Sequence, residues 1–159
     1  MDSYYLAQCA QTYGYNPEII LAGRRMNDGR GEYVANQTIK LMLEKGIQVL
    51  NSNILILAFT FKENCPDVRN TKVGDIYKAL QEYNFNNTVF DPWANPAIVE
   101  SEYGIKVVNK LSTEKFNVAI AAVAHKKFEG LDMPALLKEM HVIFDVKCTL
   151  DRKIFDGRL

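Results

Sequence analysis

The chain has little that could bind a metal or form disulfides. It contains three cysteines, Cys9, Cys65 and Cys148, which are far apart in sequence, and only two histidines, His125 and His141. These residues show no metal-ligand spacing, and an odd number of scattered cysteines is typical of a reducing compartment. The sequence therefore predicts no metal site, no disulfide framework and a cytoplasmic location.

Net charge and long apolar runs are missing too. The 19 basic and 19 acidic side chains cancel, so no excess charge favours binding to nucleic acid or to a membrane surface. No apolar run approaches the roughly 20 residues that cross a bilayer, and the N-terminal MDSYYLAQ lacks the basic and apolar regions of a signal peptide. Nucleic acid and membrane are therefore not expected as partners. With 48% hydrophobic residues, the chain can still build a real core.

Glycine is absent from the most distinctive loop. The apolar run 54–59 is too short for an average helix, which predicts a strand covered on both faces. A helical pattern begins near Lys72, and the sequence has no glycine between Phe59 and Gly74. The backbone of this loop therefore cannot approach a pyrophosphate closely, as it does in glycine-rich nucleotide-binding loops. Recognition of a ligand here would have to come from side chains.

Two cations of this loop, Lys62 and Arg69, are the candidates for that recognition. Ligands of open α/β sheets bind at the carboxyl ends of the strands, and a helix N-terminus favours an anion. Phosphate is therefore the natural ligand for the loop, with Asn70 or Thr71 as the N-cap of the following helix. The alternative is that both cations are solvated, with Arg69 paired to Asp67.

The rest of the chain divides into a helical part and an alternating part. Residues 2–46 carry helical patterns and no strand signal, whereas strand and helix patterns alternate from Asn53 onward. Such alternation predicts an α/β fold with a mostly parallel sheet and helices on both faces. We expect two domains, 1–46 and 53–159. The predicted strands are 53–59, 87–91, 105–108, 117–123 and 141–145, and the predicted helices of this part are 72–83, 95–102 and 133–140.

Other strand ends carry polar residues with weaker signals. Asp91 lies about 20 residues past the first loop, where a Rossmann unit holds its ribose-binding acid, but without the glycine fingerprint a strand-ending turn is favoured. Trp93 could stack on a base or simply pack. For His125 a capping or solvated role is favoured. Lys147 is a further cation at a strand end, and Cys65 lacks a neighbouring histidine that could activate it.

Several motifs together resemble a known family. The chain is similar to the C-terminal half of the UDP-glucose/GDP-mannose dehydrogenases, in particular to the bacterial UDP-N-acetylhexosamine 6-dehydrogenases of surface-polysaccharide pathways. The motifs are FKENCPDVRNT at 61–71, DSYYL at 2–6, AGRRMND at 22–28, FDP at 90–92, AHK at 124–126 and DVK at 145–147.

The resemblance implies an architecture and an activity. Members of the family oxidise the C6 hydroxyl of a UDP-sugar to a carboxylate in two NAD-dependent steps that use a catalytic cysteine. They combine an N-terminal Rossmann domain for NAD, a central dimerising helix and a C-terminal UDP-binding domain. Residues 1–46 would then be the end of the dimerisation region, and 53–159 a Rossmann-like domain that binds the UDP-sugar. The expected assembly is a homodimer.

The resemblance also implies roles for individual residues. Lys62 matches a lysine that contacts the substrate, with Phe61 beside it, and Lys147 matches a second basic position near the substrate. Arg69 matches an arginine that reaches the pyrophosphate of NAD. Asp2 matches a catalytic acid four residues beyond the nucleophilic cysteine, which would lie three residues before Met1. The chain alone is therefore expected to be inactive, with NAD bound mainly by a domain outside this sequence.

Two other classes of function remain open on the sequence. The chain could be a stand-alone, non-catalytic nucleotide-binding or assembly module. It could also be an unrelated doubly wound regulatory domain, because a fold does not determine a function.

Overall fold

The computed structural model describes residues 2–128, 130–148 and 150–159. The chain forms two compact units, Met1–Arg30 and Gly31–Leu159. We call them the helical unit and the sheet unit and describe each by itself.

The helical unit consists of α1 (Asp2–Thr12) and α2 (Glu18–Asp28). Gly14 separates them in the left-handed conformation, with φ of 76°, where glycine carries no steric penalty. The guanidinium of Arg24 lies over the ring of Tyr4, and no described residue of α2 is buried. The unit therefore has almost no core. Its most exposed large apolar side chains are Tyr4, Tyr5, Leu6, Tyr13, Tyr15, Ile19 and Met26.

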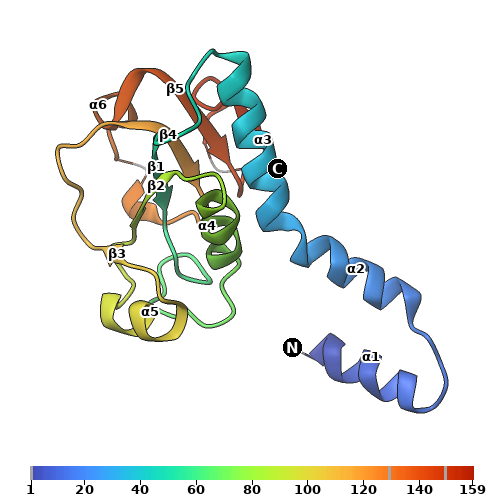
Figure 1. Ribbon diagram of the computed structural model, residues 1–159. Helices are drawn as coiled ribbons and strands as arrows, with labels where there is room; N and C mark the ends of the chain where they lie inside the picture. The colour runs from blue at the N-terminus through green and yellow to red at the C-terminus, as the bar shows by residue number, and fades with distance from the viewer. Residues whose placement is uncertain (1, 129, 149) are drawn as a thin grey trace. The chain divides into compact units, whose positions relative to one another are not determined.

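The sheet unit contains a six-stranded sheet in the order β3-β2-β1-β4-β5-β6. Every described pair of neighbouring strands is parallel. The chain moves outward in one direction from β1 to β3, then returns to the other side of β1 for β4, so the order reverses between β1 and β4 (Figure 1). The predicted parallel α/β fold is confirmed. The strands are β1 (Asn53–Leu57), β2 (Asn86–Phe90), β3 (Val107–Val108), β4 (Phe116–Ala121), β5 (Leu137–Asp145) and β6 (Gly157–Arg158).

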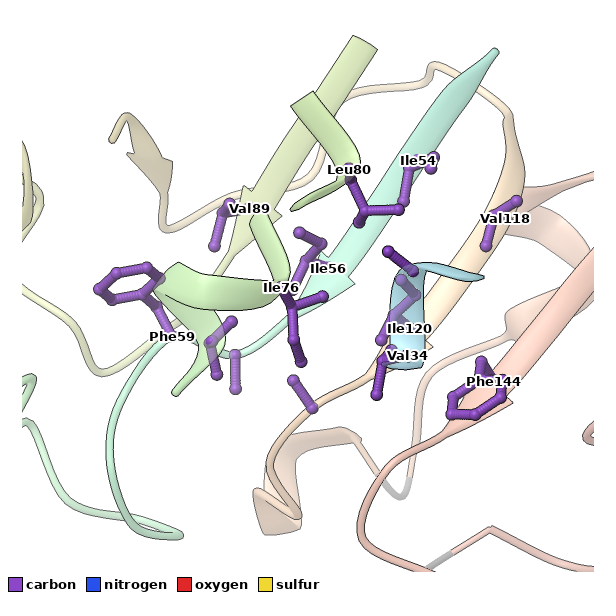
Figure 2. Packing of buried hydrophobic residues seen from close by; sticks show 14 of the residues in the cluster. Val34, Ile54, Ile56, Phe59, Ile76, Leu80, Val89, Val118, Ile120 and Phe144 are labelled. Atoms are coloured by element: carbon purple, nitrogen blue, oxygen red, sulfur yellow. The ribbon is translucent and has the colours of Figure 1, made fainter. Parts of the chain in front are cut away.

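Helices cover both faces of this sheet. The helical segments of the unit are α3 (Arg30–Glu44), α4 (Val73–Gln81), α5 (Pro96–Tyr103), the 3₁₀ turn η1 (Lys126–Phe128) and α6 (Met133–Leu136). Side chains of α3 and α4 pack on one face, where Val34, Ile76 and Leu80 meet Ile54 and Ile56 of β1 (Figure 2). The other face carries a smaller cluster.

Strand β1 shows why its sequence is apolar throughout. Successive side chains of a strand point to opposite faces. Ile54 and Ile56 belong to the cluster under α3 and α4, whereas Leu55 and Leu57 belong to the cluster on the other face with Met133 of α6. All four are at most 2% exposed. A strand buried on both faces is what the uninterrupted apolar run predicts.

Helix α3 belongs to the compact unit that contains the sheet. Val34, Ala35 and Met42 are fully buried in the main core cluster. The sheet unit consequently begins at Gly31, whereas the division expected from the sequence separates residues up to 46 from the α/β part. The composition shift at the linker marks the end of a helix, and it does not show which core that helix packs on.

The helix predicted at 133–140 is wrong beyond its first turn. Helix α6 ends at Leu136, and Leu137 is already extended and paired with Phe116 of β4. Leu137 is 2% exposed in the smaller core cluster. Strand pairing and burial thus override the helical pattern. Strand β6 was not predicted, because two residues are too few to show a period. Among the described residues, no helix has the length and apolarity needed to cross a membrane.

Close contact between α3 and α4 gives a test of this packing. A Cβ atom on Gly31 would lie 2.7 Å from the backbone carbon of Asp75, which cannot yield as a flexible side chain can. We expect Gly31→Ala to lower the free energy of unfolding by about 1–3 kcal/mol, measured by urea denaturation. Gly74→Ala is the matched control, because its Cβ would meet Tyr103 at an ordinary 3.5 Å. Equal stability of the two variants would contradict the packing.

Candidate functional site

Buried polar side chains gather at the carboxyl edge of the sheet. Thr60 follows β1, Asp91 follows β2, His125 follows β4 and Asp145 ends β5, and each is at most 2% exposed. A polar group buried without a partner is costly, so the partners of these four reveal their role. They bind mostly to the loops that leave this edge.

Asp91 ties two of these loops together. Its Oδ2 accepts hydrogen bonds from the N–H groups of Phe59 (2.7 Å) and Thr60 (2.9 Å), at the start of the loop after β1. Its Oδ1 accepts from the N–H groups of Trp93 (2.7 Å) and Ala94 (3.0 Å), after β2. Burial raises the pKa of the Asp91 carboxyl, but these donations outweigh it and hold the pKa below its ordinary value. Asp91 is therefore a structural anchor for the loops, as the favoured interpretation predicted.

His125 ties the loop after β1 to the loop after β4. Its Nδ1 accepts a hydrogen bond from the N–H of Asn64 at 2.7 Å, and its Nε2 lies 2.8 Å from Oγ1 of Thr60. The ring of Phe128 packs against it edge-on, with 5.2 Å between ring centroids. The capping role expected for His125 fits the Asn64 contact, but the solvated alternative does not, because the residue is 2% exposed.

Asn64 also accepts a hydrogen bond from the loop after β4. Its Oδ1 accepts a hydrogen bond from the N–H of Lys126 at 3.1 Å, next to His125 in the chain. Its backbone has φ of 55°, in the left-handed region, where asparagine is more readily found than most other residues. Asn64 thus joins the two loops by two hydrogen bonds of opposite direction, in addition to the contact between His125 and Thr60.

Asp145 organises the loop after β5. Its carboxylate accepts from the N–H groups of Lys147 (3.2 Å) and Leu150 (2.9 Å) and pairs with Nη2 of Arg158 (2.9 Å). Lys147 itself is exposed on this loop. The sequence identified Lys147 as a strand-end cation but gave no signal for Arg158, which reaches back from β6.

Phe61 and Lys62 protrude from the anchored loop. Phe61 is 46% exposed, and the ammonium of Lys62 lies 5.6 Å from the centroid of its ring. In the part of the chain that the structure describes, Lys62 forms no ion pair. Strands lie about 4.8 Å apart, so the ends of β1 and β5, with β4 between them, are about 10 Å apart. Lys62 and Lys147 therefore extend from the same edge, on either side of the switch point.

Arg69 is engaged differently. Its Nε and Nη2 donate to Oδ1 and Oδ2 of Asp67, both at 2.9 Å, in a bidentate pair at the surface. The Arg69 guanidinium lowers the pKa of Asp67 to about 2. This is the pairing that the alternative interpretation of the loop predicted. Further along, Oγ1 of Thr71 accepts from the N–H of Val73, the first residue of α4. The N-cap itself is Lys72, which makes no side-chain cap bond, so the N-cap predicted at Asn70 or Thr71 is wrong.

A cavity of about 520 Å³ opens beside these loops. Leu57, Ala121 and Met133 contribute to its apolar walls, and His125 and Lys126 lie at its polar side. It lies at the carboxyl ends of β1 and β4, where ligands of doubly wound sheets bind. Of the other predicted site residues, Asp2 begins α1, and its side chain lies outside the described part of the structure. In the described residues no cluster of three metal-ligating side chains occurs.

Fold and site together define a class of protein. The strand order 3-2-1-4-5-6 and the reversal between β1 and β4 are features of a Rossmann-like domain. Comparison with known families then specifies it. A profile described as "UDP-glucose/GDP-mannose dehydrogenase family, UDP binding domain" matches residues 55–152. The chain belongs to this family.

Individual relatives agree with this assignment. Over its whole length the chain is 46% identical to the UDP-N-acetyl-D-glucosamine 6-dehydrogenase of Salmonella typhi and 48% identical to that of Pseudomonas aeruginosa. It spans 38% of the length of each of these curated relatives. Among solved structures, the NDP-N-acetyl-D-galactosaminuronic acid dehydrogenase of Methanosarcina mazei Go1 superimposes with a TM-score of 0.84 at 18% identity. That match covers 98% of this chain and 36% of the other and shows a shared fold.

The role of Asp91 can be tested by Asp91→Asn. The amide turns one acceptor into a donor that faces N–H groups, so we expect a loss of about 2–3 kcal/mol of unfolding free energy at neutral pH. A carboxyl whose pKa is lowered by folding stabilises the protein above its unfolded pKa and ceases to do so in acid. The advantage of the wild type over the variant should therefore shrink below about pH 4, measured by denaturant titration. Asp151→Asn, at an exposed aspartate, is the control; a similar loss there would contradict the anchor role.

Proposed function

We propose that this chain is the UDP-binding and dimerisation part of an NAD-dependent UDP-N-acetylhexosamine 6-dehydrogenase. The observation that carries the proposal is Lys62, a projecting cation that forms no ion pair with any described residue, on an anchored loop at the switch-point edge of a UDP binding domain. The relatives that match the whole length of the chain are UDP-N-acetyl-D-glucosamine 6-dehydrogenases, which supports an N-acetylhexosamine as the sugar. The resemblance noted in the sequence makes surface-polysaccharide synthesis the proposed setting.

Substrate binding follows from the charges at this edge. A UDP-sugar carries two negative charges on its pyrophosphate, and Lys62 and Lys147 supply two positive charges from opposite sides of the switch point. A lysine is a flexible point charge, and it can follow a phosphate oxygen without a fixed orientation. Phe61 places an apolar ring next to Lys62, which suits the non-phosphate parts of the ligand.

Among the residues of the loop after β1, one side chain, that of Arg69, suits the pyrophosphate of NAD. The loop after β1 has no glycine, and the N–H groups of Phe59, Thr60 and Asn64 are already donated to Asp91 and His125. Arg69 is exposed and has the planar fork that suits a pyrophosphate, but Asp67 occupies it. Arg69 would therefore bind the cofactor by exchanging Asp67 for phosphate. NAD, when bound, accepts the hydride, and its main site would lie outside these residues.

Catalysis would need more than these residues supply. Asp2 is the acid that we assign to the hydrolytic step, where it would orient a water molecule. Neither Cys9 nor Cys148, which are exposed, nor the partly buried Cys65 has a neighbouring base among the described contacts. We infer that the chain alone binds the UDP-sugar without oxidising it.

The helical unit would provide the dimer contact. Its large apolar side chains remain exposed, with Ile19 at 88% and Tyr13 at 86%. Large exposed apolar surfaces of this kind mark protein–protein contacts. A second copy of the chain is the partner that the proposed function requires.

Calorimetric titration of the chain with UDP tests the substrate site. We expect saturable binding of UDP, and we expect Lys62→Ala to weaken it by about 1.5–3 kcal/mol, the scale of a hydrogen bond to a charged group. Lys115→Ala is the matched control. This exposed lysine precedes β4 and so lies at the amino edge of the sheet, away from the site. An unchanged affinity in Lys62→Ala would remove Lys62 from the site, and no UDP binding at all would favour the stand-alone or regulatory alternatives.

Sedimentation velocity tests the dimer. We expect a species of twice the monomer mass, which Ile19→Asp shifts to monomer because it places a charge in the contact. Ile98→Asp, on α5 of the sheet unit and 44% exposed, serves as the control and should leave the dimer intact. A monomeric wild type at high concentration would refute the proposed contact.

A further inference from the structure

His125 holds the loop on both sides of Lys62. On one side, Nδ1 accepts the N–H of Asn64 at 2.7 Å. On the other, Nε2 meets Oγ1 of Thr60 at 2.8 Å, and that hydroxyl donates to the carbonyl oxygen of Lys62 at 3.3 Å. A side chain that is 2% exposed thus reaches, directly or through one hydroxyl, the backbone of Lys62 and of Asn64.

These contacts determine the proton state of the ring. The N–H of Asn64 is a donor, so Nδ1 must carry a lone pair. The hydroxyl of Thr60 uses its proton on the carbonyl of Lys62, so its oxygen must accept the proton of Nε2. Only the neutral ring with its proton on Nε2 satisfies both contacts, because both nitrogens of a charged imidazole are donors.

We propose that His125 is a positioning residue for the UDP-sugar site: in its neutral Nε2–H form it fixes the backbone of residues 60–64 so that Lys62 meets the pyrophosphate. This inference rests on the proposed function of Lys62. His125 does not touch the ligand. It acts through the loop that presents Lys62.

Protonation would break the arrangement at one point. A proton on Nδ1 would face the N–H of Asn64 across 2.7 Å, and two donors cannot share that contact. Oδ2 of Asp91, 3.5 Å from Nε2, attracts a charged ring and keeps it in place, so the loop is the part that must move. The other groups around the ring are Thr60, the Phe128 ring and, at the cavity that His125 lines, Glu63 and Lys126. The site should therefore lose affinity as the pH falls.

Variants at position 125 separate positioning from simple packing. The Oδ1 of asparagine can take the place of Nδ1 and accept from Asn64, but asparagine does not titrate. Alanine removes both contacts. His141 provides the matched control, since it is the other histidine of the chain and contacts the carbonyls of Lys138 and Glu139 on β5.

The experiment is calorimetric titration of the full chain with UDP-N-acetylglucosamine from about pH 8 to about pH 5, the range in which histidine changes charge. A UDP-sugar is used because its phosphates, unlike the terminal phosphate of UDP, do not titrate in this range. We expect wild type and His141→Asn to lose roughly tenfold in affinity toward low pH, the scale of one hydrogen bond to a charged ligand. His125→Asn keeps the Asn64 contact but loses the one to Thr60, so it should bind more weakly than the wild type at high pH and show no further loss toward low pH. His125→Ala, which lacks both contacts, should bind roughly tenfold more weakly than the wild type even at high pH.

Two results would overturn the inference. One is a wild-type affinity that does not change with pH, and the other is an equal decline in His125→Asn. If the wild type binds no UDP-sugar at any pH, the proposed function fails. In that case, nitrogen NMR of the unliganded chain still tests whether His125 has the Nε2–H form and holds the loop. An Nε2–H tautomer, with an Asn64 amide that becomes rapidly exchanging on acidification, supports the positioning role, and any other tautomer overturns it. The same spectra show whether His125→Ala is folded.

Discussion

The carboxylate of Asp91 is the interaction on which the functional edge depends. In a parallel sheet, the loops that leave one edge have no strand partner to receive their N–H groups, and each buried N–H needs an acceptor. Asp91 receives four such groups from two loops. His125 accepts a further N–H from the loop after β1, and Asp145 accepts two from the loop after β5. These hydrogen bonds join the loops to the strands beneath them. They also fix the backbone from which the side chain of Lys62 extends.

Much of the fold could be predicted from local pattern, because burial leaves a local signature. The apolar run of β1 indicated a strand covered on both faces, and the alternation of strands and helices indicated the parallel sheet. The error in the helix at 133–140 falls where tertiary contacts decide, because Leu137 pairs with Phe116 and ends α6 early. The packing of α3 on the sheet depends on the same kind of long-range contact, which a local pattern does not show. A two-residue strand such as β6 depends wholly on its neighbour and has no signature.

The site was predictable to a different extent. The structure confirms that Lys62 and Lys147 lie after strands, as the sequence indicated, whereas their roles in substrate binding stay predictions. The Arg69–Asp67 pair was one of two stated alternatives. A capping role was favoured for His125, but its partners could not be predicted, because Thr60 and Asn64 lie 65 and 61 residues away in the chain. Contacts over such distances exist only once the sheet has formed. Asn64 has a left-handed backbone, and the only local sign of it in the sequence is that the residue is an asparagine within a loop.

The use of side-chain acceptors at this edge has a consequence for how the ligand site can change. In a glycine-rich loop the backbone N–H groups bind the phosphate, so the binding surface and the fold of the loop are the same atoms. Here N–H groups of these loops are donated to Asp91, His125 and Asp145. In the proposed site, the phosphate contacts therefore come from long side chains at the surface. The two tasks are carried by different residues. Mutation can therefore vary the charge, length and reach of exposed side chains such as Lys62 one residue at a time while the loops keep their shape.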